Sequence, residues 1–169
     1  MKQASDNIAR RTKGDIRALL KAVADPEIPV LSVIDLGIVR DISILDDGVE
    51  VAVAPTYTGC PATEVIERMI VAELQRNGIH GARIKRVLSP PWTTDWLTDE
   101  GRRKLNAYGI APPEGGVSKR RLLTPGVNVS CPRCAAVDTT CVSEFGSTPC
   151  KASYKCNACL EPFEYFKCI

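Results

Sequence analysis

Apolar residues near the start of the chain recur at the three- and four-residue spacing of a helix that buries one face. Within residues 13–24 these positions are Ile16, Leu19, Leu20 and Val23. Thr12 and Asp15 have the spacing of a capping pair ahead of this helix, and Pro26 cannot continue it. The pattern therefore predicts an amphipathic helix over residues 13–24.

A change from helical to alternating spacing marks the next segments. Residues 38–45 form an apolar run, and residues 49–53 alternate between apolar and smaller or polar side chains. Asp46-Asp47-Gly48 between them is typical of a tight turn, so the two runs predict a β-hairpin. Residues 82–88 have strand character as well, and we expect a third strand there.

Two further helices are predicted from their end signals. The first begins at Pro61, a favoured first helical residue, and stops at Asn77-Gly78. Its inward positions are Val65, Ile66, Met69, Ile70 and Leu74. The second follows Thr98 and stops at Gly109.

The order of these elements predicts the fold class and the domains. A helix, two strands, a helix, a strand and a helix form a small α/β or α+β domain of two or three layers. We expect a tail over residues 1–12, this domain over residues 13–110, and a linker over residues 111–126 that is rich in Pro and Gly. A β module rich in cysteine is expected over residues 127–169.

Composition excludes several functional classes. Of the 169 residues, 44% are hydrophobic and 25% charged, which is usual for a globular protein. The net charge of +2 is too small for the basic surface that nucleic acid requires. No segment approaches the roughly 20 apolar residues of a membrane span. We therefore expect a cytoplasmic protein with neither nucleic acid nor a membrane as its partner.

Two cysteine pairs carry the most specific chemical signal. Cys131 and Cys134, and then Cys156 and Cys159, form C-x2-C motifs 21 residues apart. This spacing is typical of two turns that direct four thiolates at one structural zinc ion per chain. An iron-sulfur cluster on the same thiolates is the second interpretation, and a redox dithiol is the third. Flanking β-prone segments predict a zinc ribbon.

The other cysteines are interpreted one by one. Cys141, Cys150 and Cys168 are expected to be small buried apolar residues on strands. Cys60 directly precedes Pro61, which would place it at the N-cap of the predicted helix, where unpaired N–H groups favour an anion. A single thiolate without a neighbouring base suits a soft metal or an iron-sulfur fragment better than acyl chemistry.

Several motifs together resemble the small metal-sulfur cluster assembly family. They are Asp25-Pro26-Glu27-Ile28-Pro29, Asp35-Leu36-Gly37-Ile38-Val39, Thr58-Gly59-Cys60-Pro61 and Pro91-Trp92-Thr93-Thr94-Asp95-Trp96. Further C-terminal matches, Phe145-Gly146-Ser147-Thr148, Cys150-Lys151 and residues 161–169, extend the likeness to the members of this family that serve bacterial phenylacetate degradation.

The resemblance implies a function and a set of residues. It implies an α/β domain, transient iron-sulfur cluster binding at Cys60, and associated loop residues at Asp25, Glu27, Asp35 and Thr58. The implied client is the iron-sulfur reductase component of phenylacetyl-CoA epoxidase. General iron-sulfur assembly proteins and a second copy of the chain are further candidate partners.

Three functional hypotheses follow, and the first is a maturation factor that is not itself an enzyme. The second, a catalytic oxygenase component, is disfavoured because the only histidine, His80, cannot supply the histidine ligands that such iron sites use. The third is a scaffold component of the epoxidase that acts through its zinc ribbon. Replacing Cys60 by serine distinguishes the first hypothesis from the third.

Overall fold

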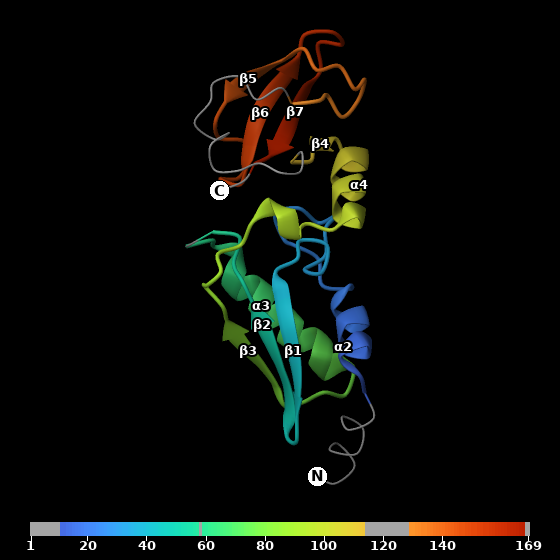
Figure 1. The fold of residues 1–169 in the computed structure, drawn as a ribbon, viewed down its shortest axis with the longest axis vertical. Helices are drawn as coiled ribbons and strands as arrows, with labels where there is room; N and C mark the ends of the chain where they lie inside the picture. Colours follow the sequence, from blue (N-terminus) through green and yellow to red (C-terminus); the bar gives the residue numbers. More distant parts are fainter. Residues whose placement is uncertain (1–10, 58, 114–128, 168–169) are drawn as a thin grey trace. The chain divides into compact units, whose positions relative to one another are not determined.

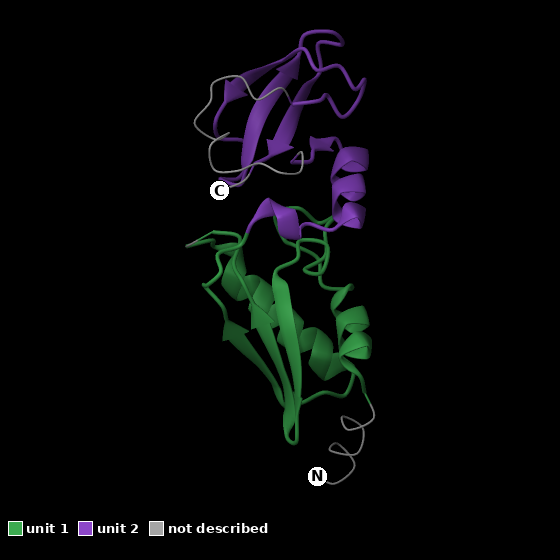
Figure 2. Ribbon diagram, viewed as in Figure 1, with its two compact units in different colours: residues 1–92 green, residues 93–169 purple. Residues whose placement is uncertain are grey.

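The chain divides into two compact units. The computed structural model describes residues 11–57, 59–113 and 129–167. Contacts group residues 1–92 as unit 1 and residues 93–169 as unit 2 (Figure 2). Thr58, Cys168 and most of the predicted linker lie outside the described residues.

Unit 1 begins with helix α2, Lys13–Leu20. The predicted capping box is confirmed, because the Thr12 side chain accepts from the Asp15 backbone while the Asp15 carboxylate accepts from the Thr12 backbone. The helix ends before residue 24. From Lys21 onward the backbone N–H groups bond to carbonyls only three residues back, which tightens the last turn out of the α-helix.

A three-stranded sheet forms the rest of unit 1, together with one long helix. Strands β1, β2 and β3 lie in that order, with β1 antiparallel to β2 and β2 parallel to β3. Their bounds are Val39–Leu45, Gly48–Val53 and Ala82–Arg86, which confirms the predicted hairpin and third strand. Helix α3, Ala62–Arg76, connects β2 to β3, and both helices pack on one face of the sheet (Figure 1).

An apolar core lies between the helices and the sheet of unit 1. Its fully buried members include Ile16, Leu20, Val49, Val51, Ile70 and Leu74. The helix residues recur at three- and four-residue spacing and the strand residues alternate, so each element presents its apolar side to this layer. Unit 1 is therefore a two-layer α+β structure, as the sequence pattern predicts.

Unit 2 combines one helix with a four-stranded sheet. A short 3-10 turn, η1 (Thr94–Trp96), precedes helix α4 (Asp99–Tyr108), which is capped by the Thr98 side chain and ends at Gly109. The strands are β4 (Ile110–Ala111), β5 (Thr139–Ser143), β6 (Lys151–Cys156) and β7 (Pro162–Phe166). Their order is β4-β7-β6-β5, and only the β4–β7 pair is parallel.

The boundary between the units differs from the one expected from the sequence. The sequence pattern assigns the α4 segment to the first domain, ahead of a linker at residues 111–126. In the structure, α4 and β4 belong to unit 2 because β4 pairs with β7. None of the described helices has the length and apolar character that a membrane span requires.

Candidate metal centre and the Cys60 loop

The four cysteines of the two C-x2-C motifs converge on one point. Their sulfur atoms all lie within 4.8 Å of one another. The Sγ atoms of Cys131 and Cys159 are 3.8 Å apart, and those of Cys134 and Cys156 are 3.6 Å apart. Four sulfurs placed tetrahedrally at about 2.3 Å from a zinc ion would be about 3.8 Å from one another. The donor set therefore fits a tetrahedral zinc ion.

The two motifs fold as matching turns. The backbone N–H of Cys131 donates to the Ala136 carbonyl at 2.9 Å, and that of Cys156 donates to the Glu161 carbonyl at 3.0 Å. The residue after each second cysteine has a positive φ, 60° at Ala135 and 65° at Leu160. A left-handed residue reverses the chain sharply, so both turns aim their cysteines at the same point.

Hydrogen bonds and neighbouring thiols shift the pKa values of the cysteines in opposite directions. The Cys159 backbone N–H is foremost in lowering the pKa of Cys156 to about 7. For Cys159 itself, the Glu161 backbone N–H lowers the pKa, but burial and the neighbouring thiols outweigh it and raise the pKa to about 12. Four adjacent thiolates repel one another, and a divalent cation removes that repulsion.

Two of the four converging cysteines belong to the core of unit 2 and the other two are exposed. One cysteine from each motif is buried in a cluster made of Ala111, Val129, Cys131, Ala152, Tyr154, Cys156, Phe163 and Tyr165. The Tyr154 ring stacks on Phe163 with centroids 5.8 Å apart and meets Tyr165 edge-on at 5.7 Å. This cluster is small, so a bound metal would supply stability that apolar burial alone does not.

The two other described cysteines of unit 2 lie apart from the metal site. Cys150 is buried, as expected, and its sulfur lies 3.0 Å from the Thr148 hydroxyl. Cys141 is exposed on β5, so the expectation of a buried residue is wrong there. Its position on the terminal strand of the sheet leaves it open to solvent.

Cys60 lies in the turn that leads into helix α3, and its thiol is half-buried. The N-cap of α3 is Pro61, so Cys60 lies one residue before the N-cap rather than at it, which corrects the sequence prediction. Pro61 has helical backbone angles, φ −66° and ψ −25°, but the bond from the Thr63 N–H to the Cys60 carbonyl spans only three residues, so the regular helix begins at Ala62. Gly59 has a φ of 86°, which shapes the turn just ahead of the thiol.

Asp25 and Asp35 shape a buried loop ahead of β1. The Asp25 carboxylate accepts from the backbone N–H groups of Glu27 and Ile28, both at 2.8 Å. The Asp35 carboxylate accepts from the backbone and the hydroxyl of Ser32, at 2.9 and 2.8 Å. These bonds satisfy polar groups in a loop that is buried over residues 31–38, although Pro26 and Pro29 are exposed, and so they fix the loop.

The sheet brings the predicted loops to one end of unit 1. Strand β1 starts and β2 finishes there, since Val39 pairs with Val53. The Ala54 N–H continues this pairing by donating to the Ile38 carbonyl at 2.9 Å. The Asp25–Asp35 loop and the Cys60 turn therefore leave the sheet at the same end (Figure 1). The Trp92 indole adds to this end by donating to the Leu36 carbonyl at 2.9 Å.

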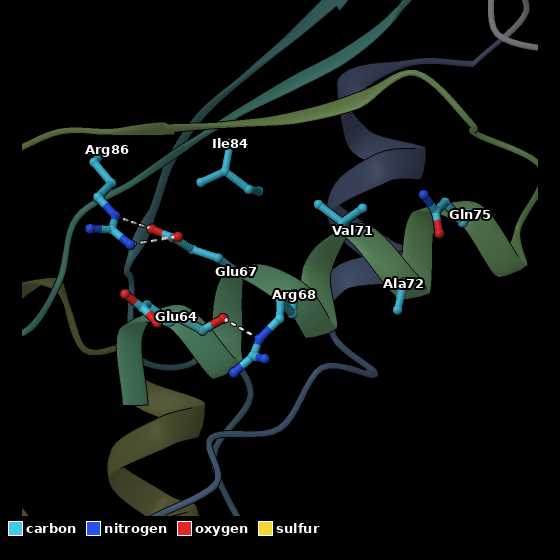
Figure 3. Close-up of a pocket in the computed structure, with 8 residues that line it drawn as sticks. All are labelled: Glu64, Glu67, Arg68, Val71, Ala72, Gln75, Ile84 and Arg86. Carbon is cyan, nitrogen blue, oxygen red and sulfur yellow. Dashed lines mark hydrogen bonds and ion pairs between the residues drawn. The ribbon is translucent and has the colours of Figure 1, made fainter. Parts of the chain in front are cut away.

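An open groove of about 520 Å³ follows helix α3 beside the edge strand β3 (Figure 3). Val71, Ala72 and Ile84 provide its apolar surface. Its charged lining is paired internally, because Arg86 binds both oxygens of Glu67 at 2.5 and 2.9 Å. The groove contains neither cysteine nor histidine, so it is not a second site for a soft metal.

The sequence analysis missed one turn residue and one short strand, and both form hydrogen bonds with the backbone. Ser32 closes a reciprocal turn with Asp35, since its hydroxyl also accepts from the Asp35 backbone at 3.0 Å. The Ser-x-x-Asp spacing was a local signal for this turn. Strand β4 was missed because its partner β7 lies far along the chain and two residues show no periodicity.

Comparisons with known proteins match two separate parts of the chain to two different family models. Residues 13–87 match the family model of an iron-sulfur cluster assembly protein, and residues 116–167 match that of the PaaD zinc beta ribbon domain. A relative from Escherichia coli K12, whose name describes it as a component of 1,2-phenylacetyl-CoA epoxidase, is 50% identical over 155 residues, which cover 92% of each chain.

Shorter relatives match part of the chain. One from Porphyromonas gingivalis W83, named "Fe-S protein maturation auxiliary factor", is 34% identical over 97 residues, covering 56% of this chain and 91% of its own. A solved DUF59 domain from Bacillus anthracis is 21% identical with a TM-score of 0.52, covering 62% of this chain and 97% of its own. The latter likeness concerns the fold alone.

Proposed function

The chain belongs to the PaaD family, in which an iron-sulfur assembly-type domain precedes a zinc ribbon, and from this premise we propose that it is an accessory factor for iron-sulfur cluster assembly. Its proposed client is the iron-sulfur reductase component of the phenylacetyl-CoA epoxidase. The names of the E. coli and P. gingivalis relatives support the pathway and the maturation role respectively.

The position of Cys60 is the observation that carries this proposal. Its thiol is half-buried in a turn, at the end of unit 1 where the Asp25–Asp35 loop also lies. A thiolate is a soft ligand that suits iron, and one ligand per chain holds a cluster weakly enough to release it. The remaining ligands would come from the client or from a second copy of the chain.

The buried loop supports the turn rather than supplying ligands. Asp25 and Asp35 use their carboxylates to hold backbone N–H groups of their own loop. Their proposed role is to keep the end of the sheet rigid, so that a cluster at Cys60 meets the client in a constant orientation. Glu27 and Thr58 remain proposed members of the same surface.

The proposed task of the zinc ribbon is to dock the client. Large apolar side chains are exposed on unit 2, including Val142 at 67% and Phe145 at 69%. Apolar side chains that gather at one place mark interaction surfaces, and Val142 lines an open pocket together with Pro162 and Phe163. The zinc ion would be structural, because four protein thiolates leave it no open coordination position.

Co-expression with the reductase tests the proposal. Cys60→Ser removes the soft ligand, and Cys141→Ser makes the same change at an exposed cysteine outside both sites. We expect the reductase to lose iron and acid-labile sulfide with Cys60→Ser and to be fully loaded with Cys141→Ser. Both variants should keep their zinc.

The scaffold hypothesis is the second candidate, and the exposed side chains of unit 2 favour it. It predicts that Cys60→Ser still yields a fully loaded and active reductase. It also predicts that changing Phe145 to serine releases the chain from the epoxidase complex. If the reductase is fully loaded when co-expressed with Cys60→Ser, the delivery hypothesis is wrong and the scaffold hypothesis takes its place.

A further inference from the structure

We infer that helix α4 and strand β4 fold as one cooperative unit with the four-cysteine module, so that zinc binding and the docking of residues 99–113 stabilise each other. The segment precedes the first metal-ligand cysteine by many residues and lies outside the zinc ribbon match at residues 116–167. The inference goes beyond the proposed function and requires only that zinc occupies the four cysteines.

Ala111 places β4 inside the core that carries the metal ligands. It is 1% exposed and belongs to the same cluster as Cys131 and Cys156, one ligand from each motif. A close-packed core transmits a change at one member to its neighbours. Displacing Ala111 would therefore loosen the cluster to which Cys131 and Cys156 also belong.

Backbone pairing fixes β4 to the strand that follows the second motif. Ile110 pairs with Glu164 and Ala111 with Tyr165 on β7, while β7 pairs on its other side with β6. Strand β6 ends at the metal ligand Cys156. Strand β4 is thus the terminal strand of the sheet that holds the second motif in place.

Helix α4 is joined to this strand without an intervening loop. Gly109, with a φ of 92°, ends the helix and directs the chain at once into Ile110. Arg102 on α4 donates to the Thr94 carbonyl at 2.8 Å and also to the Pro113 carbonyl. The helix is therefore clasped to the residues before it and to those after β4.

Thermodynamic linkage couples the folding of β4 and α4 to zinc binding. A metal-free ribbon of this size cannot hold its sheet, and β4 then loses its partner β7. An isolated helix as short as α4 is unstable in water, so it should unwind when β4 is released. By the same linkage, a docked β4 raises the affinity of the four cysteines for zinc.

Hydrogen exchange on the full chain tests the inference directly. We compare the zinc-loaded wild type with the wild type after chelation, following peptides from residues 99–113, 151–166 and 39–53. Residues 99–113 should lose protection together with residues 151–166, while residues 39–53 in unit 1 keep theirs. If residues 99–113 stay protected when residues 151–166 do not, the inference is wrong.

A pair of alanine variants gives a second readout. Ala111→Glu puts a charge into the shared core, and Ala107→Glu makes the same change on the exposed surface of α4. We expect Ala111→Glu to bind zinc at least about tenfold more weakly than wild type in competition with a chelator, or to bind none while unit 1 melts normally, and Ala107→Glu to match wild type. A wild-type affinity for zinc in Ala111→Glu would overturn the inference.

Discussion

Unit 1 and unit 2 solve the problem of stability in different ways. Unit 1 buries a continuous layer of aliphatic side chains between two helices and a sheet, and its loops satisfy their own polar groups. The core of unit 2 is a smaller cluster that includes two of the four converging cysteines. If zinc occupies these cysteines as proposed, one chain contains a part held by apolar burial and a part held by metal, and the two parts should fail independently.

Removing one metal ligand should have the largest effect, and only on unit 2. Cys156→Ser takes away one of four thiolates, and structural zinc sites in small peptides contribute about 10–16 kcal/mol when intact. We expect the variant to lose zinc and the cooperative unfolding of unit 2. Calorimetry with metal analysis checks this, and Cys141→Ser serves as the control that keeps both. If the unfolding transition of unit 2 is unchanged in a variant that has lost zinc, unit 2 does not depend on metal for its stability.

A cavity in the apolar core of unit 1 should destabilise unit 1 and leave the zinc content of the chain unchanged. Ile70 is fully buried on α3, and Ile70→Ala should lower the free energy of unfolding of unit 1 by about 2–5 kcal/mol while the zinc content stays constant. Val65 lies on the same helix but is 37% exposed, so Val65→Ala should cost much less. Denaturant melts followed separately for each unit measure both. Zinc loss in Ile70→Ala would show that the units are not independent.

The buried loop ahead of β1 should respond more mildly. Asp35→Ala leaves the backbone N–H of Ser32 without its carboxylate acceptor in a buried position, which should cost unit 1 about 1–3 kcal/mol. Thermal melts and exchange rates of residues 31–38 check this. A variant as stable as wild type would mean that the carboxylate is not needed to fix the loop.

The smallest effect concerns the capping box of α2 and its pH dependence. The Thr12 backbone N–H and then the Thr12 hydroxyl lower the pKa of Asp15 in the folded state. A carboxyl with a lowered folded pKa stabilises the fold above its unfolded pKa of about 3.9, and this contribution disappears as the pH falls through the folded pKa. Asp15→Asn should therefore lower the unit 1 melting temperature at pH 7, and the difference from wild type should vanish in acid. A difference that is independent of pH would contradict this assignment.

Local patterns predicted most of unit 1 and the convergence of the four cysteines. The hairpin at residues 38–53, the helix that stops near Asn77 and the two C-x2-C motifs each depend on neighbours in sequence, which periodicity and turn residues encode. The Thr12–Asp15 capping box is equally local, since its two side chains bond within one helical turn, and the residue spacing alone is enough to predict it.

Long-range pairing and single-residue shifts could not be predicted in this way. Strand β4 exists only because Ile110 and Ala111 meet β7, and nothing local to those two residues specifies that pairing. Cys60 lies one residue farther from α3 than predicted, because the bond from the Thr63 N–H to the Cys60 carbonyl spans only three residues and the regular helix begins at Ala62. Cys141 is exposed because β5 is the last strand of its sheet.

In the proposed function, Cys60 binds an iron-sulfur cluster and the four-cysteine centre binds zinc. Anaerobic reconstitution with iron and sulfide tests it most directly, with cluster absorbance and zinc content measured on the same samples. We predict a cluster in the wild type and in Cys141→Ser, no cluster in Cys60→Ser, and about one zinc per chain in all three. A cluster that persists in Cys60→Ser, or one that forms only as zinc is displaced, would contradict the claim.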